Sequence, residues 1–382
     1  MSNVLALKKN KFSPVAEESY TLPAHYYYDK DIFEREKEAI WFKTWQYACS
    51  LQDISEPGSF FTTMILDQPV VVTKDRTGKV RAFYNVCKHR GHMLVRGSGC
   101  SRTLRCPFHA WTYGTDGKLL SAPNAENIAG FDFDDFSLSE IRIDFLGFMI
   151  FVNFDDNAPS LAEFAPGMVE EFRQVIPHWD DLKLVRKDSF ELKANWKFIL
   201  DGMECYHCPY IHPHVMGKED SYMTQTFDAT QRKYWSTHIG YGNYELMEKQ
   251  KDKLPYPFED DTLRDIYVWY LYPNMVFVCR PGPSNFQILQ AIADGPEMSH
   301  RNMINFCLND PPTKYDLGHM DSYRDVAWPQ DREAMEMQAV GVKARGYTQG
   351  RLMVDAEHSW RSEHGTHHFQ NLVWQALNGD RY

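Results

Sequence analysis

Two short segments of the chain carry side chains that bind metals. Cys87 and His89 form a C-x-H motif, and Cys106 and His109 form a C-x-x-H motif after sixteen intervening residues. A Rieske [2Fe–2S] cluster has two thiolates on one iron and two imidazoles on the other. Each segment offers one ligand of each kind, which suits a cluster held by two loops. A zinc site with two Cys and two His is the alternative, but such sites usually place a Cys pair before a His pair.

A second group of candidate ligands lies near the middle of the chain. His207 and His212 are separated by four residues, and Glu204 precedes His207 by three positions. Two imidazoles and one carboxylate form the facial triad of non-heme Fe(II) oxygenases, which leaves coordination positions open. The spacing therefore predicts part of a mononuclear iron site. Cys205 and Cys208 offer a competing C-x-x-C pair for zinc binding or redox chemistry.

Composition limits the class of protein. The length of 382 residues favours two domains, and the hydrophobic content of 43% allows large cores. The formal net charge of −11 argues against nucleic acid as a general partner. The longest apolar run, at 145–154, is too short to span a membrane, and the basic N-terminus lacks the apolar segment of a signal peptide. We therefore expect a cytoplasmic protein whose eight cysteines are ligands and core residues.

Hydrophobic periodicity and turn residues predict an α+β chain. The residues at 75–78 predict a hairpin turn, and Ser160 predicts a helix N-cap with Glu163 as its capping-box partner. Helices are expected at 29–45, 160–176 and about 329–344, and strands at 60–65, 70–73, 80–83, 145–154, 190–192, 266–272, 275–279 and 287–292.

Taken together, the motifs resemble those of one enzyme family. C-x-H-R, C-P-F-H-A-W, N-W-K at 195–197 and E-C-Y-H-C-P from Glu204 are similar to motifs of Rieske non-heme iron ring-hydroxylating oxygenase α subunits. The similarity covers nearly the full chain. It is greatest for the branch that attacks N-methylated quaternary amines, which includes glycine betaine, stachydrine, carnitine and choline oxygenases. The segments 270–274 and 363–369 look like that branch.

The resemblance implies an arrangement of domains and subunits. It implies an N-terminal arm and helix at 1–40, and a small antiparallel β Rieske domain at 41–160. A helix-grip-like catalytic domain is implied at 161–382, with helices flanking an antiparallel sheet. It also implies a homotrimer in which electrons pass from the cluster of one subunit to the iron of its neighbour.

The resemblance further implies roles for particular residues. The implied cluster ligands are Cys87, His89, Cys106 and His109, and the implied iron ligands are His207, His212 and Asp331. Asp325 and Glu333 remain alternatives to Asp331, because Gln338 lies one residue early for the family pattern D-x4-E-x2-Q. Glu204 matches the acid that bridges the metal sites of neighbouring subunits. The preceding segment departs from the family pattern, because it lacks an Asn and is one residue short.

The implied chemistry is oxygenation with O2. The electrons would come from a separate NAD(P)H-dependent reductase with flavin and iron–sulfur centres, because the chain has no G-x-G-x-x-G motif. The expected reaction is oxidative N-demethylation or cleavage of a quaternary ammonium compound, with Trp235 and Tyr244 as candidates for an aromatic cage. Hydroxylation or dihydroxylation of a small aromatic acid is the alternative reaction. A Rieske electron carrier is the non-enzymatic alternative, against which the large second domain argues.

Overall fold

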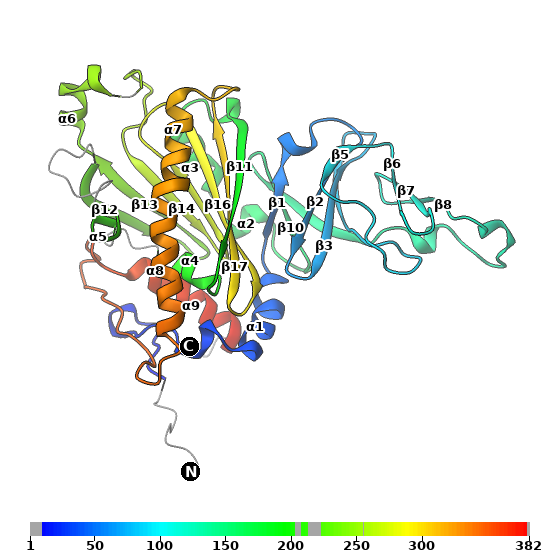
Figure 1. Cartoon of the computed structure of the whole chain (residues 1–382), viewed down its shortest axis with the longest axis horizontal. Helices are drawn as coiled ribbons and strands as arrows, with labels where there is room; N and C mark the ends of the chain where they lie inside the picture. Colours follow the sequence, from blue (N-terminus) through cyan, green and yellow to red (C-terminus); the bar gives the residue numbers. More distant parts are fainter. Residues whose placement is uncertain (1–9, 203–207, 213–222, 255, 380–382) are drawn as a thin grey trace, which may run out of the picture. The chain divides into compact units, whose positions relative to one another are not determined.

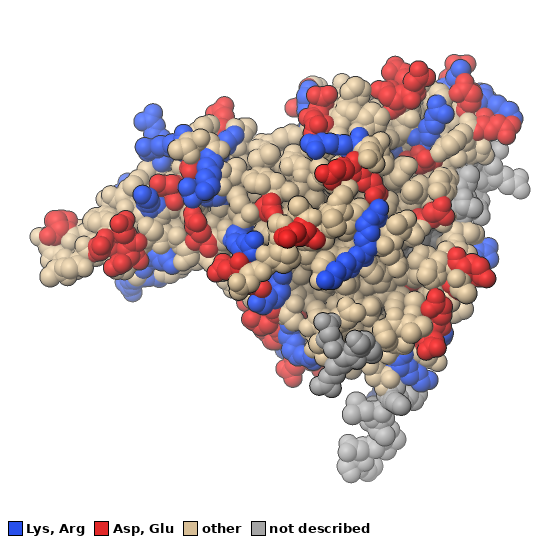
Figure 2. Space-filling model, turned by 180° about the vertical axis from the view of Figure 1, so that it is seen from behind, with Lys and Arg blue, Asp and Glu red and all other residues tan. Residues whose placement is uncertain are grey.

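The computed structural model describes residues 10–202, 208–212, 223–254 and 256–379. Contacts divide the chain into two compact units, Trp41–Pro166 and a second unit formed by residues 1–40 together with 167–382. No helix within the described ranges is long and apolar enough to cross a membrane. Acidic and basic side chains are intermixed over the face shown in Figure 2, so the net charge of −11 is not gathered in one patch there.

The unit Trp41–Pro166 is built mainly from antiparallel strands (Figure 1). A seven-stranded sheet has the order β1-β10-β9-β4-β3-β2-β5, and a three-stranded sheet has the order β6-β7-β8. The strands are β1 (Gln46–Ser50), β2 (Ser59–Ile65), β3 (Gln68–Lys74), β4 (Val80–Tyr84), β5 (Ser98–Cys100), β6 (Thr103–Arg105), β7 (Thr112–Gly114), β8 (Leu119–Ser121), β9 (Glu140–Leu146) and β10 (Met149–Asn153). Short 3-10 helices are η4 (Leu51–Ile54), η5 (Ala125–Asn127) and η6 (Asp134–Phe136).

The sequence analysis predicted one turn of this unit correctly and missed another. The hairpin turn predicted between β3 and β4 is confirmed, because the Asp75 carboxylate accepts from the N–H groups of Thr77 at 2.8 Å and Lys79 at 3.0 Å. The prediction of one strand at 145–154 was wrong. The chain turns at Gly147, whose φ of 61° is in the left-handed region that glycine adopts easily, and β9 pairs with β10.

The helix predicted at 160–176 is also interrupted. It consists of α2 (Leu161–Phe164) and α3 (Met168–Val175). Pro166 cannot donate a backbone hydrogen bond, and Gly167 has a φ of 79°, so the helix cannot continue through this pair. The break coincides with the boundary between the two compact units.

The starts of two helices follow the sequence prediction. Ser160 and Glu163 form the predicted capping box at α2. Asp29 caps α1 (Lys30–Glu36) by accepting from two backbone N–H groups. The helix predicted at 29–45 is shorter than expected, because α1 passes into the π-helix η3 (Lys37–Trp41) and β1 begins soon after it.

The second unit contains a seven-stranded antiparallel sheet in the order β11-β17-β16-β15-β14-β13-β12. Its strands are β11 (Lys183–Leu192), β12 (Met223–Gln231), β13 (Trp235–Gly242), β14 (Ile266–Leu271), β15 (Met275–Cys279), β16 (Asn285–Gly295) and β17 (Met298–Cys307). Besides α1 and α3, its described helices are α4 (Lys197–Asp201), α5 (Cys208–Ile211), α6 (Tyr244–Lys249), α7 (Lys314–Ser322), the π-helix η10 (Tyr323–Ala327), α8 (Trp328–Gly341), α9 (His364–Asn378) and the 3-10 helices η1 (Ala16–Glu18), η2 (Ala24–Tyr27), η7 (Trp179–Asp181) and η9 (Lys251–Lys253). The α+β class and the four predicted strands of this unit are confirmed.

The two faces of this sheet pack against different helices. Trp269 and Phe277 point toward α3, where the Phe172 ring lies 4.9 Å and 5.4 Å from theirs between centres. Because side chains alternate along a strand, their neighbours on β14 and β15 point to the opposite face. There α7, η10 and α8 follow one another as a long helix across the sheet (Figure 1). The helix predicted at about 329–344 is the last part of this longer helix.

Candidate functional site

The two loops that carry the first four candidate ligands have the same backbone geometry. In each, the N–H of the cysteine, Cys87 or Cys106, donates to the carbonyl of the fifth residue after it at 2.8 Å. The cysteine carbonyl accepts from the N–H of the fourth residue after it at 3.0 Å. That fourth residue is Gly91 in one loop and Ala110 in the other, with φ of 73° and 60°. Alanine in this region costs roughly 1–2 kcal/mol, so the rest of the loop must hold it there.

The side chains of these loops form a thiol pair and an imidazole pair. Cys87 and Cys106 are buried, at 2% and 3% exposure. Burial raises the pKa of Cys87, and the neighbouring Cys106 thiol adds to this effect. The rings of His89 and His109 lie 4.7 Å apart between centres, in an edge-to-face arrangement nearer the surface. Two thiols inside and two imidazoles outside match a two-iron cluster with Cys ligands on one iron and His ligands on the other.

Two aromatic residues to which the sequence analysis assigned no role support these loops. The Tyr113 hydroxyl lies 3.4 Å from Cys87 Sγ and accepts from the Lys88 N–H at 3.0 Å. The Trp111 ring stacks on His89 at 4.9 Å with an interplanar angle of 7°. In the sequence, both residues could have been singled out by their position directly after the second ligand loop. They fix the sulfur and ring orientations on which a metal site depends.

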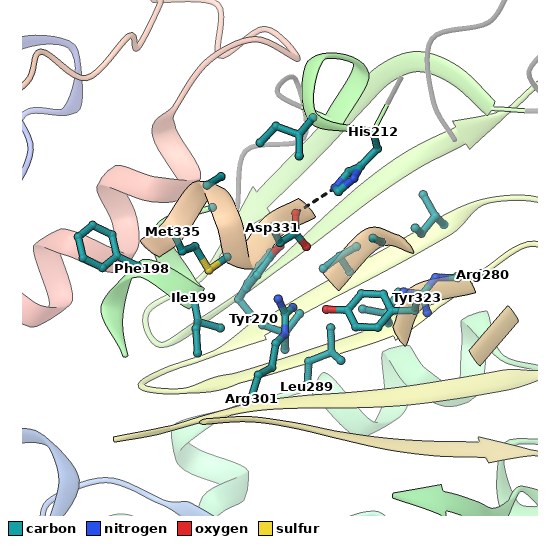
Figure 3. A pocket seen from close by; sticks show the side chains of 18 of the residues that line it. Phe198, Ile199, His212, Tyr270, Arg280, Leu289, Arg301, Tyr323, Asp331 and Met335 are labelled. Atoms are coloured by element: carbon teal, nitrogen blue, oxygen red, sulfur yellow. Dashed lines mark hydrogen bonds and ion pairs between the residues drawn. The ribbon is translucent and has the colours of Figure 1, made fainter. Parts of the chain in front are cut away.

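The second candidate site is formed by residues far apart in the sequence. His212 follows α5 and is 7% exposed, and its Nε2 lies 2.9 Å from Asp331 Oδ1 on α8 (Figure 3). Its Nδ1 lies 2.7 Å from Gln330 Oε1, so the amide oxygen accepts the Nδ1 proton. This arrangement leaves Nε2 directed at the Asp331 carboxylate. A metal-binding histidine usually donates its other ring N–H in this way.

Of the candidate acids Asp331, Asp325 and Glu333, Asp331 is the one that lies beside His212. Its side chain also lines a pocket, which is described below. Asp325 instead pairs with Arg324 at 2.5 Å and has a 56% exposed side chain. Glu333 is exposed as well. The predicted Glu204 and His207 lie outside the described residues, as does Cys205 of the competing C-x-x-C pair.

A pocket of about 480 Å³ lies between the long helix and the sheet. The helix contributes side chains at steps of four residues, which place them along one face. The helix residues spaced in this way are His319, Tyr323, Ala327, Asp331 and Met335. The pocket is also lined by His212, by Phe198 and Ile199 from α4, and by sheet residues that include Phe227, Val268, Tyr270, Val276, Val278, Leu289 and Arg301. The lining is mainly apolar and aromatic.

The two predicted cage residues lie elsewhere. Trp235 is 2% exposed, and the Arg232 guanidinium lies 3.8 Å from its ring centre. The hydroxyl of Tyr244 donates to Asp265 Oδ2 at 2.6 Å, and this residue is 44% exposed. Neither lines the 480 Å³ pocket. Tyr270 lines that pocket. Side chains alternate along β14, so Tyr270 points to the pocket face of the sheet whereas Trp269 points toward α3.

Comparisons with known proteins match both units. Residues 44–132 match the model of the Rieske [2Fe-2S] domain, and residues 179–379 match that of the ring hydroxylating alpha subunit catalytic domain. The carnitine monooxygenase oxygenase subunit of Escherichia coli (strain K12) is 33% identical over 364 residues, which cover 94% of this chain and 95% of that protein. The glycine betaine monooxygenase oxygenase subunit of Pseudomonas aeruginosa (strain UCBPP-PA14) is 34% identical over 202 residues, 52% of this chain and 46% of that protein.

Solved structures agree with this assignment. The quaternary ammonium Rieske monooxygenase CntA in complex with L-carnitine has a TM-score of 0.86 and 30% sequence identity, covering 97% of this chain and 99% of that chain. The naphthalene 1,2-dioxygenase of a Rhodococcus species, at 17% identity and a TM-score of 0.78, shares the fold. The sequence resemblance is therefore confirmed: this chain belongs to the Rieske ring-hydroxylating oxygenase family, as an oxygenase subunit related to the carnitine and glycine betaine monooxygenases.

Proposed function

We propose that this chain is the terminal component of an oxygenase system that acts on a quaternary ammonium compound. The observation that carries the proposal is the meeting of His212 and Asp331, 2.9 Å apart, at a mainly apolar pocket of about 480 Å³. Relatives that match over nearly the full chain include proteins named carnitine monooxygenase and, at 26% identity, a choline monooxygenase, and related structures contain L-carnitine or gamma-butyrobetaine.

The residues of the first unit fit a Rieske cluster. Cys87 and Cys106 would hold one iron, and His89 and His109 would hold the other. When bound, the cluster supplies electrons one at a time. Trp111 and Tyr113 hold the His89 ring and the Cys87 sulfur in position through the contacts described above.

The residues of the second unit fit a mononuclear Fe(II) site. His207, His212 and Asp331 would be its ligands, and Gln330 would favour the His212 tautomer with the proton on Nδ1 and an unprotonated Nε2, the form that binds a metal. When bound, such an iron supplies O2 activation. Glu204 is proposed to link this site to the cluster of a neighbouring subunit in a homotrimer. A separate NAD(P)H-dependent reductase would supply the electrons.

The pocket lining suits the reaction. The rings of Phe198, Phe227 and Tyr270 offer faces to a quaternary ammonium group, each worth about 0.5–2 kcal/mol when in contact. The apolar side chains around them exclude water from the reacting carbon. In the overall reaction, one C–H bond, O2, two electrons and two protons give one C–OH group and one water.

The position of hydroxylation decides the products. A hydroxyl on a carbon bonded to quaternary nitrogen is unstable, because loss of its proton forms a C=O bond and breaks the C–N bond. Reaction at an N-methyl group releases formaldehyde and a tertiary amine. Reaction at the methylene of the longer chain releases trimethylamine and an aldehyde.

A substrate panel tests this proposal. The enzyme with its cluster and iron, a compatible reductase and NAD(P)H are mixed with carnitine, γ-butyrobetaine, glycine betaine or benzoate, and O2 uptake and products are measured. We expect substrate-dependent O2 uptake with formaldehyde or trimethylamine from a quaternary ammonium compound. A cis-diol from benzoate would instead favour the aromatic-acid reaction, and electron transfer without any product would favour the carrier.

A further inference from the structure

One end of the substrate pocket contains buried polar atoms without hydrogen-bond partners. Among the described residues, nothing bonds to Arg301 Nε, the Tyr323 hydroxyl or His319 Nε2, although all three are shielded from solvent. All three residues line the 480 Å³ pocket, and Arg280 lines it too. Figure 3 shows Tyr323 between Arg280 and Arg301. Buried polar groups are almost always bonded, so this cluster is suited to bind a polar ligand group.

The two arginines are also without acidic partners. Within the described part of the chain, no carboxylate forms an ion pair with Arg280 or Arg301. Arg301 is 6% exposed, and its guanidinium lies 5.2 Å from the Trp328 ring centre and 5.6 Å from that of Tyr323. The Arg280 guanidinium lies 5.7 Å from the Tyr323 ring centre, so this ring contacts both cations. A guanidinium has five N–H donors, and Arg301 Nε has no hydrogen-bond partner among the described residues.

Neighbouring side chains hold Arg280 in place. Arg280 Nη1 donates to Gln287 Oε1 at 2.9 Å, and Gln287 Nε2 donates to Asn305 Oδ1 at 2.8 Å. The Arg280 backbone N–H donates to Asn285 Oδ1 at 3.0 Å. Burial lowers the pKa of Arg280, which shows that its charge is costly where it lies. A fixed, buried and uncompensated pair of cations disfavours the folded chain unless an anion binds there.

The Tyr323 hydroxyl is suited to donate to that anion. Burial, the largest influence, raises the pKa of Tyr323 to about 12, so the phenol keeps its proton at neutral pH. Its oxygen has no acceptor among the described residues. A carboxylate accepts hydrogen bonds from guanidinium and hydroxyl groups and has no donor that could clash with them.

We infer that Arg280, Arg301 and Tyr323 bind the carboxylate of a quaternary ammonium substrate and thereby set which end of the substrate lies near Asp331. The inference rests on the proposed function and narrows its substrate class. The arginines repel the ammonium group and direct it toward Asp331 and the aromatic rings. These three residues, the carboxylate subsite, thereby orient the substrate as well as bind it.

The long helix sets the length of this substrate. Tyr323 begins the π-helix η10 and Asp331 lies eight residues later on α8, and both side chains line the pocket. A substrate with its carboxylate at Tyr323 and its ammonium group near Asp331 needs its two charged groups to be separated by several methylenes. We therefore expect γ-butyrobetaine, with three methylenes, to bind better than glycine betaine.

Binding to the loaded enzyme without reductase tests the subsite directly. Calorimetry compares γ-butyrobetaine with butyltrimethylammonium, which lacks the carboxylate, and with the all-carbon carboxylate in which a quaternary carbon replaces nitrogen. We expect Arg301→Met to raise the Kd of γ-butyrobetaine by roughly 10- to 100-fold, as for a lost charge-assisted hydrogen bond. The Kd of butyltrimethylammonium should change little. Tyr323→Phe should give a smaller loss with the same selectivity. Arg324→Gln is the matched control, because Arg324 pairs with Asp325 outside the pocket.

Thermal unfolding and turnover complete the test. Arg301→Met should melt at or above the wild-type temperature, because it removes an uncompensated buried charge; if it fails to fold, Tyr323→Phe still reports on selectivity. Equal binding of γ-butyrobetaine and butyltrimethylammonium to the wild type, or equal weakening of both by the variants, overturns the subsite. If the two compounds bind equally but both are turned over, the subsite is wrong and the proposed function still holds. Arg301-dependent binding of the all-carbon carboxylate, without turnover of any ammonium compound, supports the subsite and contradicts the proposed function.

Discussion

A fully buried ion pair links the N-terminal helix to the catalytic sheet unit. Lys197 Nζ on α4 lies 2.5 Å from Glu36 Oε1 at the end of α1, and both side chains are 0% exposed. Trp196 Nε1 donates to the other Glu36 oxygen at 2.9 Å. Burial raises the pKa of Glu36 and lowers that of Lys197, although each group favours the charged form of the other. The pair includes the lysine of the N-W-K motif, so its role is testable in this chain.

Lys197→Met should destabilise the protein strongly, because it leaves the Glu36 carboxylate buried without a cation. Breaking a buried pair in this way costs about 3–5 kcal/mol. At about 2–4 °C per kcal/mol for a domain of this size, the melting temperature should fall by roughly 10 °C. The double variant Glu36→Gln with Lys197→Met should recover most of this loss, because it removes both charges and keeps an acceptor for Trp196.

The free energy of unfolding of Lys197→Met should also depend on pH, in a defined direction. In Lys197→Met, the folded chain favours protonated Glu36, whereas the unfolded chain releases that proton above the ordinary pKa of a glutamate. Stability of the variant therefore falls as pH rises, by up to about 1.4 kcal/mol per pH unit, and its deficit shrinks toward pH 5. Denaturant unfolding of wild type and both variants between pH 5 and pH 8 measures this. A loss below about 1 kcal/mol, or a double variant no better than the single one, would refute the reasoning.

Three further predictions concern the metal sites. Asp331→Ala should lose mononuclear iron by metal analysis and keep the cluster signal in electron paramagnetic resonance; retained iron with full activity would transfer the ligand role to a neighbouring acid. Glu204→Gln should keep both metals and reduction by the reductase, but slow oxidation of the cluster by the iron site by orders of magnitude, and near-wild-type oxidation would contradict the bridge. Co-expression of inactive His109→Ala and His212→Ala chains should restore partial activity in mixed trimers, whereas background activity would indicate electron transfer within one chain.

The cluster loops were predictable because their chemistry is local. Each C-x-H or C-x-x-H motif lies within one tight loop, so the sequence predicts which cysteine and histidine each loop brings together. The capping box at Ser160 and the hairpin turn after β3 were predictable for the same reason. The errors at 145–154 and 160–176 arose where Gly147 and the Pro166-Gly167 pair break an otherwise continuous apolar pattern.

The pocket was less predictable because its residues converge only in three dimensions. Arg280 follows β15, Arg301 lies on β17 and Tyr323 begins the π-helix, so no local pattern relates them. The sequence shows many aromatic residues on strands but not which face of the sheet each one occupies. Trp235 and Tyr244 were chosen from that set, whereas the structure places Tyr270 in the pocket beside His212.

Single turnover of the reduced enzyme tests the central claim most directly. The enzyme is loaded with both metals, reduced chemically, freed of reductant and mixed with O2, with and without γ-butyrobetaine. The account predicts that cluster oxidation is fast only with the substrate present, and that formaldehyde or trimethylamine is released in proportion to the clusters oxidised. Fast cluster oxidation that does not depend on the substrate and yields no product would contradict it.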